Sequence, residues 1–470
     1  MSAALGGCFV SKVDPQKPQL PLPDALPAQA ADTSPLPNPW WTLFGDARLN
    51  ELIEEALKHN PDAQIAAARV AEARSLLRIT NADRLPAVNL EGIGTRSRQS
   101  ELSLAEQGLQ GVPGLDTHQT TYTVQGVVGY ELDLWGQYQR ASESARALLL
   151  NSEYGREATK LSLTGEVARG YFALIAAAEQ LARGRDTLAG REESLKLEKL
   201  RFDAGESDEF TYKRAEAEAA AARVSMRQLE IQLVARTNAL GVLLGRSPKA
   251  LADEAIDLQG VSLPMPVQLP AALPSSVLEQ RPDIGAAEAA LDAAAADIGV
   301  ARAQLFPSIS ITGAFGSVSP ELSDLFTGPA KAWSASGGLL QPLFQGGRLR
   351  ANVSRTEAIR EQRKSEYART VQQAFREVLD ALQSQALIDG VRTANDQQVA
   401  ALSRATELAE LRYGQGDIAY LELLDVRRSL YQAQIDLVAA QRDALLNAVD
   451  LALAVGGGMG DLAEPLTARR

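Results

Sequence analysis

The side chains best suited to chemistry gather in one short, charged stretch near residue 420. They recur at i, i+4, i+8 and i+11, so a helix would carry them in one stripe. The stripe consists of Asp417, Leu421, Asp425 and Arg428. Glu422 adds a carboxylate one residue along. Carboxylates brought together repel one another and attract cations. The ordinary alternative is a solvated helix face with no further role.

Composition excludes several kinds of site. The 470-residue chain has 59 Asp and Glu against 47 Lys and Arg, a net charge of −12, whereas nucleic-acid binding requires clustered basic residues. It contains one Cys and two His, which form no recognisable metal-ligand cluster. The sequence has no Gly-rich nucleotide loop and no nucleophile motif. It therefore predicts neither an enzyme nor a bound cofactor, and no nucleic-acid partner.

The single cysteine lies in a distinctive context. Cys8 follows Leu5-Gly6-Gly7, an arrangement that resembles a bacterial lipobox, in which the cysteine is acylated. The short stretch before it lacks the basic and apolar regions of a secretion signal, so we expect an upstream start or a trimmed sequence. The Pro-rich stretch 15–39 is expected to be an extended linker. A lipid on Cys8 would tether the chain to a membrane, and a stray free thiol is the alternative.

Four segments alternate between apolar and polar side chains, the two-residue period of a β-strand with two different faces. These strands are expected at 87–97, 120–134, 307–317 and 332–343. In the third, Ile309 and Ile311 share one parity and Ser308 and Ser310 the other. No run approaches the roughly 18 apolar residues of a membrane helix. A membrane crossing would therefore use these strands. A soluble sandwich with a dry core is the alternative, but the sequence offers no strands for a second sheet.

The chain contains two copies of one plan. Asn60-Pro61-Asp62 recurs as Arg281-Pro282-Asp283 at an offset of 221. Gly205 and Gly416 are related by an offset of 211, as are Gly245 and Gly456 and the tripeptides Leu200-Arg201-Phe202 and Leu411-Arg412-Tyr413. A constant offset across separate regions indicates an internal duplication. The ten-residue difference between the offsets falls between the strands, where the first copy has a longer loop at 98–119.

Each copy is expected to contain a helix, two strands and a long helical hairpin. The opening helices are predicted at 46–84 and 274–305, and the hairpin helices at 137–202, 208–245, 347–412 and 418–455. A 66-residue helix rises about 100 Å, far beyond a globular domain. Two adjoining seven-residue ladders begin at Leu423 and Leu424, so the last helix should contact neighbours on two sides. A coiled-coil scaffold without a pore would explain these ladders but not the strands.

Four strands cannot close a barrel, and an open sheet edge is not tolerated in hydrocarbon. Two copies would give eight strands, a barrel filled by its own side chains. Three copies would give twelve strands and a lumen. The polar parity would then face water inside the barrel and the apolar parity would face lipid.

A set of motifs spread over nearly the whole chain is shared with a known family. The motifs are Pro39-Trp40-Trp41-Thr42-Leu43-Phe44-Gly45-Asp46, Arg281-Pro282-Asp283, Gln341-Pro342-Leu343-Phe344, and Arg412-Tyr413 before Gly416. At this spacing the chain resembles the TolC-like outer membrane efflux proteins, in particular their lipid-tethered OprM-type subgroup. Trp40 and Trp41 are expected to be packing anchors rather than a ligand site.

The resemblance implies a mostly α-helical homotrimer with membrane β-structure. Each chain gives four strands to a 12-stranded β-barrel, which an α-helical barrel continues into the periplasm. The implied function is the exit duct of a tripartite efflux pump, which passively conducts drugs and other small amphiphiles. The implied partners are a periplasmic adaptor protein, an inner-membrane pump of the resistance–nodulation–division class and outer membrane lipid. The duct of a type I protein secretion system is the alternative.

The predicted division of the chain follows from this scheme. The segments are 1–45 for lipobox and tether, 46–86 for the first opening helices, 87–135 for strands one and two, 136–246 for the first long hairpin, 247–273 for a linker, 274–306 for the second opening helix, 307–345 for strands three and four, 346–456 for the second long hairpin and 457–470 for the tail.

A duct must be able to close, and the hairpin tips at 203–208 and 413–417 are expected to lie far from the barrel. Gly205 and Gly416 permit the turns there. By resemblance, Leu421 and Asp425 belong to a periplasmic gate with Glu422 as a further acidic position, and by spacing Asp417 joins it. By resemblance, Tyr413 ties neighbouring hairpins together. Arg412 is expected to pair with an acidic residue of the other tip, where the candidates are Asp203, Glu206, Asp208 and Glu209.

Overall fold

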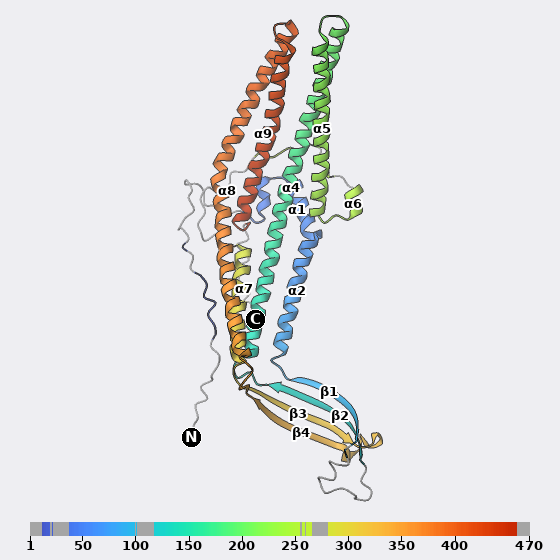
Figure 1. Cartoon of the computed structure of the whole chain (residues 1–470), viewed down its shortest axis with the longest axis vertical. Coiled ribbons are helices and arrows are strands. Elements are labelled where there is room, and N and C mark those ends of the chain that lie inside the picture. Colours follow the sequence, from blue (N-terminus) through green and yellow to red (C-terminus); the bar gives the residue numbers. More distant parts are fainter. Residues whose placement is uncertain are drawn as a thin grey trace. The chain divides into compact units, whose positions relative to one another are not determined.

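The computed structural model describes residues 12–18, 21, 37–98, 100, 117–253, 256–258, 260–265 and 281–457 (Figure 1). The chain forms two compact units, the first from Met1–Pro18, Ala71–Asn151 and Glu288–Glu366, the second from Gln19–Val70, Ser152–Ala287 and Tyr367–Arg470. None of the helices in the described ranges is both long enough and apolar enough to span a membrane. Cys8, most of the loop predicted at 98–119 and the tail from 458 lie outside the described residues.

The helices and strands follow the same order in both halves of the sequence. The first half contains η1 (Trp40–Phe44), α1 (Ala47–His59), α2 (Pro61–Ala82), β1 (Ala87–Arg98), β2 (His118–Glu131), α4 (Gln137–Asp203), α5 (Glu209–Leu243) and α6 (Pro248–Asp253). The second contains α7 (Pro282–Ala303), β3 (Ser308–Ser319), η3 (Leu322–Asp324), η4 (Gly328–Ala330), β4 (Lys331–Leu340), α8 (Arg348–Gln415) and α9 (Tyr420–Ala454). The predicted fold class, mostly α with four strands in two repeats, is confirmed.

The paired hairpins are nearly equal in length, as a duplication requires. Helices α4 and α8 have 67 and 68 residues, and α5 and α9 have 35 each. On α9, Leu423, Leu424, Leu445 and Leu451 of the two predicted ladders are all buried. The wide apolar face predicted for this helix is therefore confirmed.

Several boundaries differ from the sequence predictions, including that of the fourth strand, which ends at Leu340 rather than at 343. The opening helix expected at 46–84 is two helices, because the chain turns at Asn60 before Pro61, whose preceding residue is disfavoured in helical conformation. The second strand ends at Glu131 rather than at 134. Helix α8 continues to Gln415, so the second tip begins at Gly416 and Arg412 and Tyr413 lie in the last turn of the helix.

Matched glycines terminate the matched helices. Gly205 and Gly416 have φ of 77° and 83°, and Gly245 and Gly456 have φ of 73° and 83°. This left-handed conformation is the usual helix C-cap, and residues other than glycine adopt it only with strain. At Gly245 a Cβ atom would also lie 2.4 Å from the backbone oxygen of His59. The duplication predicted from sequence offsets is therefore present in the backbone.

The repeated X-Pro-Asp sequences do the same work in each half. The side chain of Asn60 donates to the backbone oxygen of Leu243 at 2.8 Å, near the end of α5. Arg281 donates through Nη1 to the backbone oxygen of Ala454 at 2.8 Å, at the end of α9. Each therefore satisfies a carbonyl that the helix leaves without an internal partner. The two side chains differ, but the position they fill is the same.

The four strands form one antiparallel sheet in the order β1-β2-β3-β4. Their register places the alternating apolar side chains of all four strands on one face of the sheet. On this face Val88 lies opposite Val128, Tyr130 opposite Ile311, and Phe315 opposite Trp333. The other face carries polar side chains: Gln125 donates to Glu91 at 3.2 Å. The single apolar face inferred from the two-residue period is confirmed.

The tryptophan motif has a structural explanation. Trp40 is 1% exposed, donates through Nε1 to the hydroxyl of Thr164 at 3.2 Å, and packs against Phe44. Asp46 caps α1 by accepting from the backbone N–H of Arg48 and Leu49. The motif thus anchors the start of the chain's helical region, as expected.

Candidate functional site

One polar contact ties the ends of α4 and α8 together, close to both hairpin tips. The Tyr413 hydroxyl donates to a carboxylate oxygen of Glu198 and accepts from Nη1 of Arg201 at 2.7 Å. Nη1 of Arg201 also lies 3.3 Å from Oε1 of Glu198, and its guanidinium lies 5.0 Å from the centre of the Tyr413 ring. We call these three residues the tip tie.

The tip tie is enclosed by protein. Glu198 is 1% exposed and receives a further hydrogen bond from Ser207 at 3.4 Å. Tyr420 is also buried, and its ring centre lies 5.9 Å from that of Tyr413. Burial, then the hydrogen bond to Glu198, raises the pKa of Tyr413 above its ordinary value of 10.0. The phenol therefore stays protonated and keeps donating at any physiological pH.

Two of the acidic residues predicted at the first tip, Asp203 and Asp208, form local contacts. Asp203 pairs with Lys199 at 2.8 Å, one helical turn back. Asp208 accepts from the backbone N–H of Thr211 at 2.7 Å, which caps α5 and lowers the pKa of Asp208. Glu206 is exposed in the turn itself. The first tip is thus built by capping rather than by contact with Arg412.

The predicted gate residues are exposed on and just before α9. Leu421 is 50% exposed, and Glu422 and Asp425 are exposed near it in the first turns of the helix. Asp417 precedes the helix, so the helical part of the predicted stripe begins at Leu421, and the place of Asp417 in the gate stays a prediction. Arg428 is not free in the stripe, because its Nε donates to Glu218 of α5 at 3.1 Å.

Arg412 forms no ion pair with the part of this chain that the structure describes. Its counterpart in the first repeat, Arg201, makes the contact with a tyrosine and a carboxylate instead. Phe202 occupies the position equivalent to Tyr413 and stacks on Tyr212 at 5.5 Å. The expected pairing of Arg412 with an acidic tip residue is therefore not found within one chain. A pairing with another copy remains a prediction.

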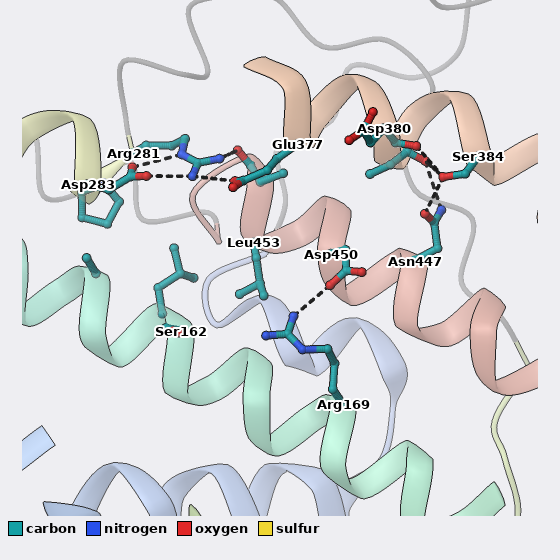
Figure 2. A pocket seen from close by; sticks show the side chains of 15 residues that line it. Ser162, Arg169, Arg281, Asp283, Glu377, Asp380, Ser384, Asn447, Asp450 and Leu453 are labelled. Carbon is teal, nitrogen blue, oxygen red and sulfur yellow. Dashed lines mark hydrogen bonds and ion pairs between the residues drawn. The ribbon is translucent and has the colours of Figure 1, made fainter. Parts of the chain in front are cut away.

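A second polar cluster lies where α4, α7, α8 and α9 meet in the second unit. Figure 2 shows Arg281 between the carboxylates of Asp283 and Glu377, at 2.8 and 2.9 Å. Arg169 pairs with Asp450 across the same cavity of about 530 Å³ at 2.8 Å. The Arg281 guanidinium also caps α9, so one buried side chain links three helices.

Replacement of Arg281 by alanine is expected to lower the free energy of unfolding by about 2–3 kcal/mol, because it leaves two carboxylates and a helix-terminal carbonyl without their donor. The loss would be read as a lower Tm of the purified protein in detergent. Arg376→Ala is the matched control, since Arg376 is 65% exposed and lies 3.9 Å from Asp380. Equal Tm values for the two variants would contradict the assigned role of Arg281.

Sequence reasoning missed both partners of Tyr413. Arg201 was visible as the repeat equivalent of Arg412, and Glu198 lies one turn before it on α4. Their contact with Tyr413 joins residues more than 200 positions apart, and no local spacing encodes it. Across the described residues no group of three or more His, Cys, Asp or Glu side chains is placed to hold a metal ion.

Two repeats, each with helices, two paired strands and a very long helical hairpin, define the fold class of this chain. The profile of the outer membrane efflux protein family matches residues 52–246 and 273–457. The chain is 34% identical to the probable efflux pump outer membrane protein TtgC of Pseudomonas putida, over 97% of this chain and 93% of that protein. It is 33% identical to the cation efflux system protein CusC of Escherichia coli K12, over 97% and 98%.

The solved structures show the same fold. The CmeC outer membrane channel of Campylobacter jejuni superposes with a TM-score of 0.85, covering 94% of each chain at 24% identity. The chain therefore belongs to the outer membrane efflux protein family. It is an outer membrane efflux protein.

Proposed function

We propose that three copies of this chain form a closed, gated duct that passively conducts small amphiphilic molecules out of the periplasm. The observation that carries the proposal is the sheet. Within the described residues both outer strands, β1 and β4, have an edge that pairs with no other strand. An unpaired edge is not tolerated in lipid. Pairing β4 of one copy with β1 of the next removes every edge, and three copies give twelve strands.

The helices of the second unit support assembly independently. Large apolar side chains remain exposed at coiled-coil spacing on α5, where Val224, Ile231 and Val234 are 58%, 69% and 59% exposed. Helix α8 carries a similar exposed row that includes Leu387 and Leu411, at 71% and 63%. Apolar rows of this kind mark contacts with other helices. Helix α5 of one copy would cover α8 of the next.

The gate belongs to the same proposal. In a trimer, Asp425 and Glu422 become rings of three carboxylates and Leu421 a ring of three apolar side chains. Such rings close a passage to large solutes and attract cations to its mouth. The tip tie would hold each α8 against α4 in the closed state, and its release would let the hairpins part.

The duct is not the component that selects the cargo. The relatives TtgC and CusC are almost equally similar to this chain, yet the name of one refers to an efflux pump and the name of the other to cation efflux. Selection would then rest with an inner-membrane pump and its periplasmic adaptor, which we propose as partners. A lipid on Cys8 would anchor the N-terminal segment to the outer membrane.

The two faces of the sheet provide a direct test. We expect Ser310→Cys to react with a water-soluble maleimide several-fold faster than Ile311→Cys, because the first would face the aqueous lumen and the second lipid. Both variants would carry Cys8→Ala, which should still assemble because the barrel holds the copies together. Cross-linking and native mass would report three copies. Equal labelling of the two positions, or a monomer in detergent, would refute the closed barrel.

A further inference from the structure

A small cavity of about 230 Å³ lies between α4, α8 and α9 in the second unit, and none of the predicted gate residues lines it. Its polar lining side chains include Thr187 and Arg191 of α4, Glu410 of α8, and Arg427 and Gln434 of α9. The cavity is too small for a drug-sized molecule, since such ligands occupy about 300–1,000 Å³. Its volume suits a small ion with a few waters.

Arg191 is the unusual residue of this cavity. Arg191 is only 5% exposed, and its Nη1 has no hydrogen-bond partner among the described residues. Among the described residues no carboxylate forms an ion pair with it. A guanidinium keeps its proton in proteins, so Arg191 cannot relieve the burial by becoming neutral. Burial lowers the pKa of Arg191 relative to an exposed arginine, and the nearby Glu218 carboxylate offsets only part of that shift.

The carboxylates nearest to Arg191 form their ion pairs with other arginines. Arg427 donates to Glu410 at 2.7 Å and to the hydroxyl of Ser194 at 2.8 Å. Arg428 is paired with Glu218 of α5. Asp186 also lines the cavity, but it is exposed on the same helix and forms no ion pair with Arg191. Within the described residues Arg191 is therefore the arginine of this cavity that has no carboxylate at ion-pair distance.

We propose that this cavity binds a small oxyanion, with the size and charge of inorganic phosphate or a simple carboxylate, on the guanidinium of Arg191. The parallel N–H groups of arginine match two oxygens of such an anion. The Thr187 hydroxyl and the Gln434 amide lie on the cavity wall as further donors, from α4 and α9. A bound oxyanion would thus join the two hairpins of one chain.

Thermal unfolding of the purified full-length protein tests the proposal. In zwitterionic buffer with potassium chloride, we expect Arg191→Gln to be at least as stable as the wild type, because the substitution removes an unpaired buried charge. Replacing chloride by phosphate or acetate at equal ionic strength should raise the wild-type Tm saturably by about 2 °C or more. The variant should show no such rise. The phosphate and acetate arms distinguish an inorganic anion from a carboxylate.

Two further variants keep the result interpretable. Arg223→Gln removes an exposed arginine that pairs with Glu192, and it should respond to phosphate as the wild type does. Arg191→Lys keeps the positive charge but loses the paired N–H donors of the guanidinium, so saturation should need about tenfold more anion. A crystal soaked in selenate should show anomalous density beside Arg191.

The proposal is overturned if the wild type shows no saturable anion effect, or if Arg191→Gln keeps it. It is equally overturned if Arg191→Gln is less stable than the wild type in both buffers, since Arg191 then has a purely structural role. An experimental structure with Arg191 paired to Asp186 or Glu410 would also exclude an anion.

Discussion

Tyr413→Phe is expected to shift the duct toward its open state. The substitution removes the hydroxyl that donates to Glu198 and accepts from Arg201, and it leaves a carboxylate that is 1% exposed with one donor fewer. A hydrogen bond to a buried charge contributes about 1.5–3 kcal/mol. If the tip tie exists only in the closed state, the open population should rise by about 10–150-fold.

Planar lipid bilayers and whole cells both report this change. The variant should show a higher resting conductance, and cells that express it should admit a large antibiotic that the closed duct excludes. Tyr431→Phe is the matched control, because the Tyr431 hydroxyl shares a hydrogen bond with the neutral Ser225 hydroxyl at 3.3 Å rather than with a charged group. A resting conductance of Tyr413→Phe no higher than that of the control would show that the tip tie does not hold the duct closed.

The pH dependence of the closed state follows from the same residue. The pKa of Tyr413 is raised from 10.0, first by burial and then by Glu198, so its neutral form is the stabilised one. That stabilisation is fully present below pH 10 and is lost only as the pH rises through the raised pKa. Tyr413 should therefore hold the wild-type duct closed equally well at pH 6 and pH 9.

Asp425→Ala is expected to abolish most of the cation selectivity of the duct and its block by multivalent metal ions. In a trimer this one substitution removes three carboxylates from the mouth. Loss of three converging charges should weaken metal block by at least about tenfold, since an exposed ion attracts each carboxylate with about 1 kcal/mol. Bilayer recordings with added trivalent cations give the blocking concentration and the reversal potential gives the selectivity.

Asp436→Ala controls for the loss of acidic charge on the same helix. Asp436 is exposed on α9, about three helical turns further from the tip than Asp425, and it accepts a hydrogen bond from Gln432 at 2.9 Å. This variant should keep wild-type selectivity and metal block. Unchanged block in Asp425→Ala would show that the carboxylate ring is not where the current is restricted.

Local periodicity was enough to predict the four strands and the four long helices of this fold. The alternation around Ile311 determines one face of β3, and the register then carries the same face across to Tyr130 on the neighbouring strand. The paired glycines at the helix ends were predictable because left-handed backbone favours one residue type. Both signals depend on a residue and its near neighbours in the chain.

The polar contacts of the second unit were not predictable in that way. The Arg201–Tyr413 and Arg281–Ala454 contacts join residues 212 and 173 positions apart. Their side chains meet only because particular turns of long helices face each other. The end of α8 was predicted at 412, three residues before its actual end at Gln415. The helix continues through Gly414 and ends only where Gly416 adopts the left-handed conformation.

The two repeats of one chain have matching turns, but the side-chain contacts at their tips differ, and this difference should affect how the duct opens. Arg201 donates a hydrogen bond to Tyr413, whereas the side chain of Arg412 forms no ion pair within the described residues. A ring of three such chains would contain six similar hairpins, but the tip tie would join them at only three of the six junctions. The aperture should then widen as the three chains move relative to one another as whole units. The motion should be concentrated at the junctions that Arg412 faces.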